Sequence, residues 1–163
     1  MKIAYADPPY VGQARKLYRR PEVDHLDLIN DLMENFPDGW ALSASSPSLA
    51  TILHMCPTGV RVGAWVKPFA IFKPGVNPAY AWEPVLFMGG RKRERFEPTV
   101  RDWVSCNITL RRGLCGAKPE GFCFWLFELM GMKPGDKLVD LFPGTKGVTK
   151  AWRVWCKQQK SAR

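Results

Sequence analysis

The chain has 163 residues, enough for one domain with a core of its own. Apolar residues make up 46% and charged residues 24%, which excludes an intrinsically disordered chain. The formal net charge of +9 favours a polyanionic partner, nucleic acid before an anionic membrane surface. No stretch approaches the roughly 18 apolar residues of a spanning helix, and the amino terminus lacks a signal-peptide pattern. Five widely spaced cysteines and two histidines indicate reduced thiols in a cytoplasmic protein and no metal site.

The first element is a strand, Lys2 to Tyr5, followed by a rigid turn of sequence Ala-Asp-Pro-Pro-Tyr over 6–10. Pro8 and Pro9 fix φ and have no N–H, so the local backbone offers bare carbonyl acceptors. Asp7 adds a carboxylate and Tyr10 a flat aromatic face. Two acceptors beside a stacking platform suit the exocyclic amine of a planar base. The alternative is an ordinary Asp-initiated turn that contains prolines.

A basic loop spans 11–20, where four cations surround an aromatic residue. Such a loop suits a strand of phosphates with a stacked base, although a solvated loop explains the composition equally well. Its position beside the turn favours nucleic acid. The candidate nucleic-acid-binding residues of this loop are Arg15, Lys16, Arg19 and Arg20.

Helices and strands alternate through the next part of the chain. A helix is expected over 21–36, with Pro21 at its first position and the Pro-Asp-Gly turn after it. Its core-facing stripe comprises Leu26, Ile29, Leu32, Met33 and Phe36. The further expected elements are a strand over 40–44, a short helix over 47–55, a strand over 60–66, an ordered loop over 68–80 and a strand over 83–88 whose start Pro84 marks.

The most basic section follows, over 91–112, where seven cations outnumber three acids and aromatic residues interrupt the charge. This mixture predicts a nucleic-acid-contacting loop, and we treat 91–117 as a candidate target-recognition excursion within a single domain. A plain surface excursion is the alternative. The candidate nucleic-acid-binding residues here are Arg91, Lys92, Arg93, Arg95, Arg111 and Arg112.

Regular patterns return at the carboxyl-terminal end. A helix is expected from Pro119 to about Met130, apolar on nearly every side and ended by a glycine. A strand over 137–142 then leads through a glycine loop over 143–147 into a last helix. Glycines let backbone approach a ligand, and Asp140 at the strand end suits a ligand's ammonium group. A tight strand-to-helix turn is the equally probable alternative.

The two constellations together resemble a known family. Asp7-Pro8-Pro9-Tyr10 is similar to the catalytic motif of S-adenosylmethionine-dependent amino-methyltransferases. Three segments resemble the cofactor half of those enzymes: Lys118-Pro119-Glu120-x-Phe122, Gly135-Asp136 and Asp140-x-Phe142-x-Gly144. The segment Glu83-Pro84-Val85-Leu86 also resembles that group. The order, catalytic half first, resembles the circularly permuted DNA adenine-N6 methyltransferases, in particular small phage-type ones.

The resemblance implies an α/β, Rossmann-like methyltransferase fold, permuted and truncated, with about five main strands and helices on both faces. The strands ending near Asp7 and Asp140 would lie side by side. Asp7 and the Pro8 carbonyl would orient the adenine amine, and Tyr10 would stack on the flipped base. Methyl transfer from S-adenosylmethionine to DNA in a bacterial host cell is the implied activity. The residues implied for the cofactor site are Ala6, Asp7, Lys118 near the methionine carboxylate, Asp140, Phe142, Pro143, Gly144 and Thr145.

Two departures from the family pattern open alternatives. Lys146 stands where the family has a second glycine, and the chain ends one helix later, before the strands that cover the cofactor's adenosine. A homodimer that completes the pocket is one expectation from this. A catalytically inactive module that binds nucleic acid or protein is a second, and an enzyme acting on RNA adenine or on cytosine N4 is a third.

Overall fold

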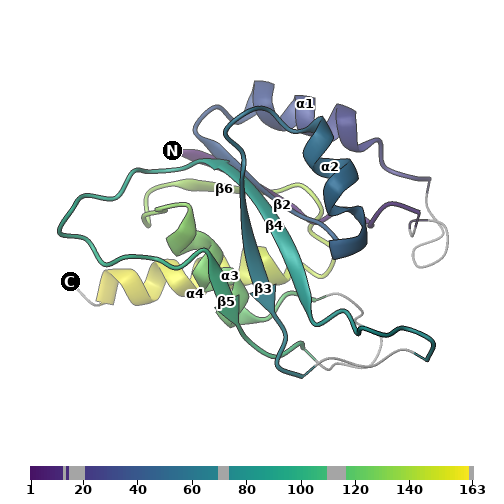
Figure 1. Cartoon of the computed structure of the whole chain (residues 1–163). Helices are drawn as coiled ribbons and strands as arrows, with labels where there is room; N and C mark the ends of the chain where they lie inside the picture. Colours follow the sequence, from purple (N-terminus) through teal and green to yellow (C-terminus); the bar gives the residue numbers. More distant parts are fainter. Residues whose placement is uncertain (13, 15–20, 70–73, 110–116, 162–163) are drawn as a thin grey trace.

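The protein is described by a computed structural model over residues 1–12, 14, 21–69, 74–109 and 117–161. Within these residues one mixed sheet runs through the molecule, with helices on both faces (Figure 1). The expected α/β architecture is therefore confirmed. The strands lie in the order β5-β3-β4-β2-β1-β6. Their bounds are β1 (Lys2–Ala6), β2 (Gly39–Ser43), β3 (Arg61–Val66), β4 (Trp82–Gly89), β5 (Trp103–Ser105) and β6 (Lys137–Asp140).

Strand directions decide where the functional residues gather. β1 pairs in parallel with both β2 and β6, and Tyr5 of β1 is in register with Asp140 of β6. β4 is antiparallel to β2 and β3, and β3 pairs in parallel with β5. The carboxyl ends of β1, β2 and β6 therefore meet at one edge of the sheet. The end of β4 lies at the opposite edge, where Gly89 pairs with Gly39.

Two helical layers cover the sheet (Figure 1). Because side chains of a strand alternate between faces, Ile3 and Tyr5 of β1 face one core, and Ala4 and Ala6 face the other. No helix in the described ranges is long and apolar enough to cross a membrane. The helices are α1 (His25–Asn35), η2 (Ser46–Ser48) and α2 (Leu49–Met55) on the face of Ala4, and α3 (Glu120–Leu129) and α4 (Gly147–Ser161) on the face of Tyr5.

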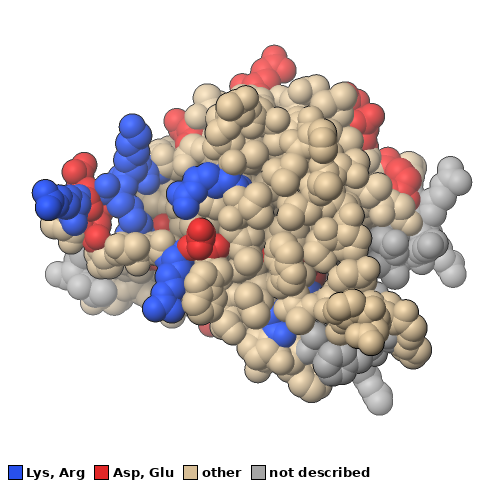
Figure 2. All heavy atoms as spheres, in the orientation of Figure 1, with Lys and Arg blue, Asp and Glu red and all other residues tan. Residues whose placement is uncertain are grey.

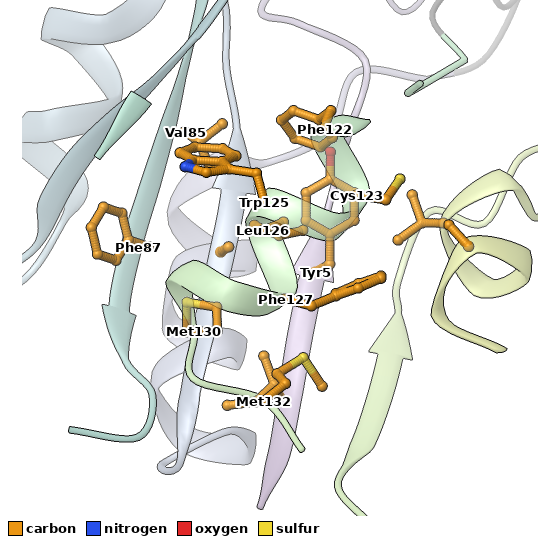
Figure 3. Close-up of a cluster of buried hydrophobic side chains, with 14 of the residues drawn as sticks. Tyr5, Val85, Phe87, Phe122, Cys123, Trp125, Leu126, Phe127, Met130 and Met132 are labelled. Carbon is orange, nitrogen blue, oxygen red and sulfur yellow. The ribbon is translucent and has the colours of Figure 1, made fainter. Parts of the chain in front are cut away.

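The core under α3 is aromatic (Figure 3). The Phe122 ring lies 6.1 Å from that of Tyr5, 5.2 Å from that of Trp65 and 5.7 Å from that of Trp125, measured between centroids. Tilted aromatic pairs of this kind contribute about 0.5–1.5 kcal/mol each beyond their buried area. They fix the start of α3 against β1 and β3, and so fix the position of Lys118 just before it.

The first helix is shorter than the sequence pattern predicts. It begins at His25 rather than at Pro21, because Asp24 caps it. The Asp24 carboxylate accepts hydrogen bonds from the backbone N–H groups of Leu26 and Asp27, at 2.9 and 3.1 Å. An aspartate at the N-cap satisfies two otherwise unpaired donors, which proline at the first helical position does not.

The core-facing stripe of α1 is also narrower than expected. Ile29, Leu32 and Phe36 are buried, but Leu26 and Met33 are 48% and 38% exposed. The apolar stripe predicted from periodicity is thus correct in its centre and wrong at its margins.

Several strands differ from expectation. β4 begins at Trp82, so Pro84 lies inside the strand, where its carbonyl accepts the Ala44 N–H at 3.0 Å. β6 ends at Asp140, two residues before Phe142. The short strand β5 was not predicted, because it lies within the charged section that we interpreted as a loop.

A charged cluster around Asp136 holds the sheet together at the end where β1 and β6 begin. The Asp136 carboxylate accepts the terminal ammonium of Met1 at 2.7 Å and the backbone N–H of Lys133 at 2.7 Å. Both terminal nitrogens of Arg91 bind the same carboxylate, at 3.0 and 3.2 Å. This cluster aligns the starts of β1 and β6 and so sets the register that brings Asp140 beside Tyr5.

Candidate active site

The Asp7–Tyr10 turn and the Asp140 loop lie at the same edge of the sheet. Asp7 directly follows β1, Asp140 ends β6, and the two strands are neighbours. The side chain of Asp7 is 23% exposed, so a ligand has access to it. The sequence-based expectation that these two strand ends lie side by side is confirmed. This edge is where ligands bind in open α/β sheets.

Four charges of alternating sign, each from a different segment of the chain, meet at this edge. The Lys118 ammonium, whose side chain is only 3% exposed, lies 3.0 Å from Asp7 Oδ1 and 3.1 Å from Glu83 Oε2. Glu83 also forms an ion pair with Lys67 through its Oε1. We call Lys67, Glu83, Lys118 and Asp7 the charge chain. Its two cations balance its two carboxylates, which is the condition for keeping such charges away from water.

Aromatic rings enclose the charge chain. The Lys118 ammonium lies 5.4 Å from the ring centroid of Trp65 and 5.8 Å from that of Phe122. The Lys67 ammonium lies 4.7 Å from the centroid of the same Trp65 ring. Ring faces attract cations and exclude water, so they strengthen the ion pairs beside them.

The ionisable groups of the chain have shifted pKa values. Burial raises the pKa of Asp7 above its usual range, and Lys118 opposes that rise through its charge and its hydrogen bond. Burial also disfavours the charged form of Lys118, but Asp7, Tyr5, Tyr10 and Glu83 together hold its pKa well above the ordinary value. Burial opposes ionisation of Glu83 too, yet Lys118 and Lys67 keep its pKa low. Lys118 is therefore a permanent cation at neutral pH.

The remaining residues of the turn differ in how deeply they are buried. Pro8 is buried, while Pro9 and Tyr10 are half-buried. Burial raises the pKa of the Tyr10 hydroxyl well above its ordinary value, so the phenol stays neutral. The Ala6 side chain is fully buried in the core on the α1 face, and the contact of Ala6 with the cofactor stays a prediction.

Asp140 forms the second half of the site. Its Oδ2 accepts a hydrogen bond from Thr149 Oγ at 3.2 Å, while its Oδ1 is buried without a hydrogen-bond partner in the described chain. Burial raises the pKa of Asp140 and the negative charge of Asp7 raises it further, while hydrogen bonds from Thr149 and from the Phe142 backbone oppose the rise. A buried carboxylate oxygen without a donor, near a second carboxylate, suits a cationic ligand.

The loop after β6 keeps a glycine-like backbone. Lys146 has φ +61°, the left-handed conformation that glycine adopts without strain. Gly144 also has positive φ, and Pro143, Gly144 and Thr145 are exposed. Phe142 is partly buried against the core on the α1 face. Lys146 therefore adopts a backbone conformation that glycine would adopt without strain.

The four basic candidates that the structure describes lie away from this edge. Arg91 and Arg93 lie beyond the end of β4, at the opposite edge, and form ion pairs with Asp136 and Glu128. Lysine and arginine are abundant at the end of the molecule that carries the β4–β5 loop (Figure 2). Lys92 and Arg95 are exposed in that loop. The other candidates, Arg15, Lys16, Arg19, Arg20, Arg111 and Arg112, lie outside the described residues.

A basic pocket also lies away from the strand ends. A cavity of about 300 Å³ opens at the edge where β4 ends and is lined by Arg61, Phe87, Gly89 and Lys92 among others. It holds none of the residues of the charge chain. The candidate site at Asp7 and Asp140 is therefore separate from this cavity.

Sequence reasoning missed Glu83 and Lys67 as site residues. Glu83 carried a signal, because an acid within the otherwise apolar strand Trp82 to Met88 requires a partner when buried. Lys67 carried none, since a lysine just after a strand is normally solvated. The proposed contact of Lys118 with a methionine carboxylate stays a prediction, and its observed partners are Asp7 and Glu83.

Two solved structures share the fold. The crystal structure of the M1.HpyAVI–SAM complex matches with a TM-score of 0.66 at 15% identity, over 95% of this chain and 78% of that chain. The crystal structure of M1.HpyAVI matches with 0.61 at 12% identity, over 96% and 76%. No model of a known protein family and no curated protein matches the sequence. The chain therefore has the Rossmann-like methyltransferase fold that its sequence led us to expect.

Proposed function

We propose that the protein transfers a methyl group from S-adenosylmethionine to an exocyclic amine of a nucleic-acid base, with the N6 amine of adenine in DNA as the first candidate. The observation that carries the proposal is the pairing of β1 with β6, which sets Asp7 beside Asp140. One strand end offers an amine acceptor and the other offers an anionic seat for a cation. The fold shared with the M1.HpyAVI–SAM complex supports the same assignment.

The residues present fit the cofactor. S-adenosylmethionine carries an ammonium and a sulfonium, and the buried, partnerless Asp140 Oδ1 is an acceptor for such a charge. Asp140 would hold the cationic end, with Gly144 and Thr145 allowing close backbone approach. When bound, the cofactor supplies an electrophilic methyl group, which bonds to the amine nitrogen as the carbon–sulfur bond breaks and its electrons pass to sulfur.

The chain's own residues would then orient the base. Because Asp7 Oδ1 is the oxygen that pairs with Lys118, Oδ2 would accept one amine hydrogen, and the Pro8 carbonyl would accept the other. Tyr10 would stack on the ring, an interaction worth about 1–3 kcal/mol for each base. The proton released from the nitrogen would pass to Asp7 Oδ2 and then to water. Alignment of nitrogen and methyl group supplies most of the expected rate gain.

The test is a methylation assay with methyl-labelled S-adenosylmethionine. Double-stranded DNA, single-stranded DNA and RNA are separate arms, and digestion to nucleosides separates N6-methyladenine from N4-methylcytosine. Asp7→Asn should lower the rate by about 100-fold or more, as expected for a group that handles the proton. Glu34→Gln, at an exposed site on α1, is the matched control. Absence of any methylated nucleoside at high enzyme concentration would refute the proposal.

A second candidate is a module that binds nucleic acid or protein without catalysis. The observation that favours it is Lys146, an exposed cation in the loop where a cationic cofactor would bind. Calorimetry with S-adenosylmethionine separates the two candidates. A dissociation constant in the micromolar range, about −8 kcal/mol, supports the enzyme, and no heat of binding supports the module.

Adenine-N6 specificity, DNA as partner, a homodimer and a circularly permuted, phage-type origin remain predictions. β6 pairs with β1 alone in the described part of the sheet, so its other edge is open to a further strand or a second subunit. Sedimentation with and without S-adenosylmethionine tests whether dimerisation accompanies cofactor binding.

A further inference from the structure

We propose that Lys118, held in place by Glu83, is a positioning residue that fixes one oxygen of Asp7 and leaves the other free to accept the target amine. This inference rests on the function proposed above, and it adds a role that neither the motif nor the fold assigns. It concerns how the chain prepares Asp7 before any base enters the site.

The first step is the geometry of the ammonium. Lys118 Nζ lies 3.0 Å from Asp7 Oδ1 and 3.1 Å from Glu83 Oε2, so two carboxylates from different strands share it. Glu83 is itself bound by Lys67 through its other oxygen. Because Lys67 anchors Glu83, the Lys118 ammonium is held on one side by an anchored carboxylate and faces Asp7 on the other. Asp7 is therefore held by a fixed charge rather than by a mobile side chain.

The second step is rigidity. Lys118 precedes α3, and Phe122 in the first turn of α3 packs on Tyr5 of β1 and on Trp65 of β3. Trp65 is in turn the register partner of Glu83. The backbone segments that carry the charge chain are thus joined by one aromatic core. A shift of any one of them changes the distance between Lys118 and Asp7.

The third step is the state of the carboxylate. Only an ionised Asp7 offers an acceptor on each oxygen, whereas a protonated one donates from one of them. Burial and the charge of Glu83 favour protonation of Asp7, while Lys118 and Lys67 oppose it. Tyr5, Tyr10 and Asp140 also face this group, and Lys118 is the largest of the influences that favour ionisation. Lys118 thus favours the ionised form of Asp7, which offers an acceptor on its second oxygen.

The experiment titrates Asp7 directly. The protein is labelled with carboxyl-¹³C aspartate, Asp7→Asn assigns the signal, and the pH is varied without any ligand. Lys118→Met should raise the pKa of Asp7 by at least one unit, and Lys118→Arg should restore most of the change. Glu83→Gln should shift it the opposite way, because Glu83 favours protonation. Lys157→Met, at an exposed lysine of α4, should change nothing.

The same variants are then followed by the methylation rate against pH. In Lys118→Met the acidic limb of the kcat profile should move to higher pH by the shift seen in the titration, and most activity should return above that limb. A lysine needed only for folding would not show this alkaline recovery. Thermal unfolding checks each variant, and Glu83→Gln keeps the test valid if Lys118→Met does not fold.

Each outcome separates the two proposals. An Asp7 pKa within 0.3 unit of wild type in Lys118→Met, or in the wrong direction in Glu83→Gln, overturns the role of Lys118. The expected titration shifts in a protein that methylates no nucleic acid support the role of Lys118 in fixing Asp7, but overturn the proposed reaction. Methylation with a pH profile that Lys118→Met does not move supports the reaction and overturns the inference.

Discussion

Replacing Asp136 by asparagine tests the cluster that sets the register of β1 and β6. Burial opposes ionisation of Asp136, but hydrogen bonds from Arg91, the terminal ammonium and the Lys133 N–H lower its pKa to about 2 from 3.8. A depression of this size corresponds to about 2 kcal/mol of stability. The side chain is 6% exposed, so solvent weakens this contribution little. Asp136→Asn should therefore lower the free energy of unfolding at pH 7 by about 2 kcal/mol.

The sign of the pH dependence follows from the direction of the shift. Because the folded-state pKa is depressed, the contribution is complete above pH 4 and is lost as the pH falls through 2. At pH 3 about half of it, roughly 1 kcal/mol, should remain. Urea unfolding of wild type, Asp136→Asn and the exposed control Glu34→Gln at pH 7 and pH 3 measures this. An equal loss at both pH values, or a loss below about 0.5 kcal/mol at pH 7, would refute the reasoning.

Three further substitutions test the fold and the cofactor side. Gly39→Ala should lower the free energy of unfolding in urea by about 3 kcal/mol, because Gly39 has φ +148° and an added Cβ would lie 2.5 Å from the Gly90 nitrogen. Gly59→Ala is the matched control: Gly59 has φ +92° but open space around it, so the loss should be only about 1–2 kcal/mol. Lys146→Gly should stabilise by up to about 1 kcal/mol by relieving its left-handed strain, and a lower melting temperature would contradict this. Asp140→Asn should raise the melting temperature of the ligand-free protein at pH 7, because a carboxyl group with a raised folded-state pKa loses stability when it ionises. The same substitution should weaken S-adenosylmethionine binding in calorimetry, and unchanged affinity would contradict the role assigned to Asp140.

The sequence predicted the parts of the site that depend on local structure. Asp7 follows a strand and Asp140 ends one, and parallel neighbours bring their ends to one edge without further information. The glycine loop and the helix after it were likewise visible as a strand–turn–helix pattern. The strands and the turn-to-helix pattern followed from periodicity and turn residues, whereas the expectation that the two strands are neighbours came from the resemblance to the amino-methyltransferases.

The charge chain was not predictable in the same way. The ion pair between Lys118 and Glu83 joins residues 35 positions apart, and it depends on the packing of Phe122 against Trp65. Neither residue type nor spacing encodes that packing. The placement of Arg91 failed for a related reason, because the antiparallel direction of β4 takes it to the far edge. A basic segment shows in a sequence, but the edge at which it lies is a property of the topology.

The two halves of the site differ in how far they are prepared for a ligand. At the amine half, Lys118 already neutralises Asp7, and Glu83 and Lys67 balance the remaining charge. At the cofactor half, Asp140 retains a buried oxygen without a donor, and its pKa is raised by burial and by Asp7. An unsatisfied buried acceptor costs about 1–3 kcal/mol, which a cationic ligand would recover on binding. We therefore expect the affinity for a cation to come from pairing the buried Asp140 oxygen, whereas Asp7 needs no rearrangement to receive a neutral amine.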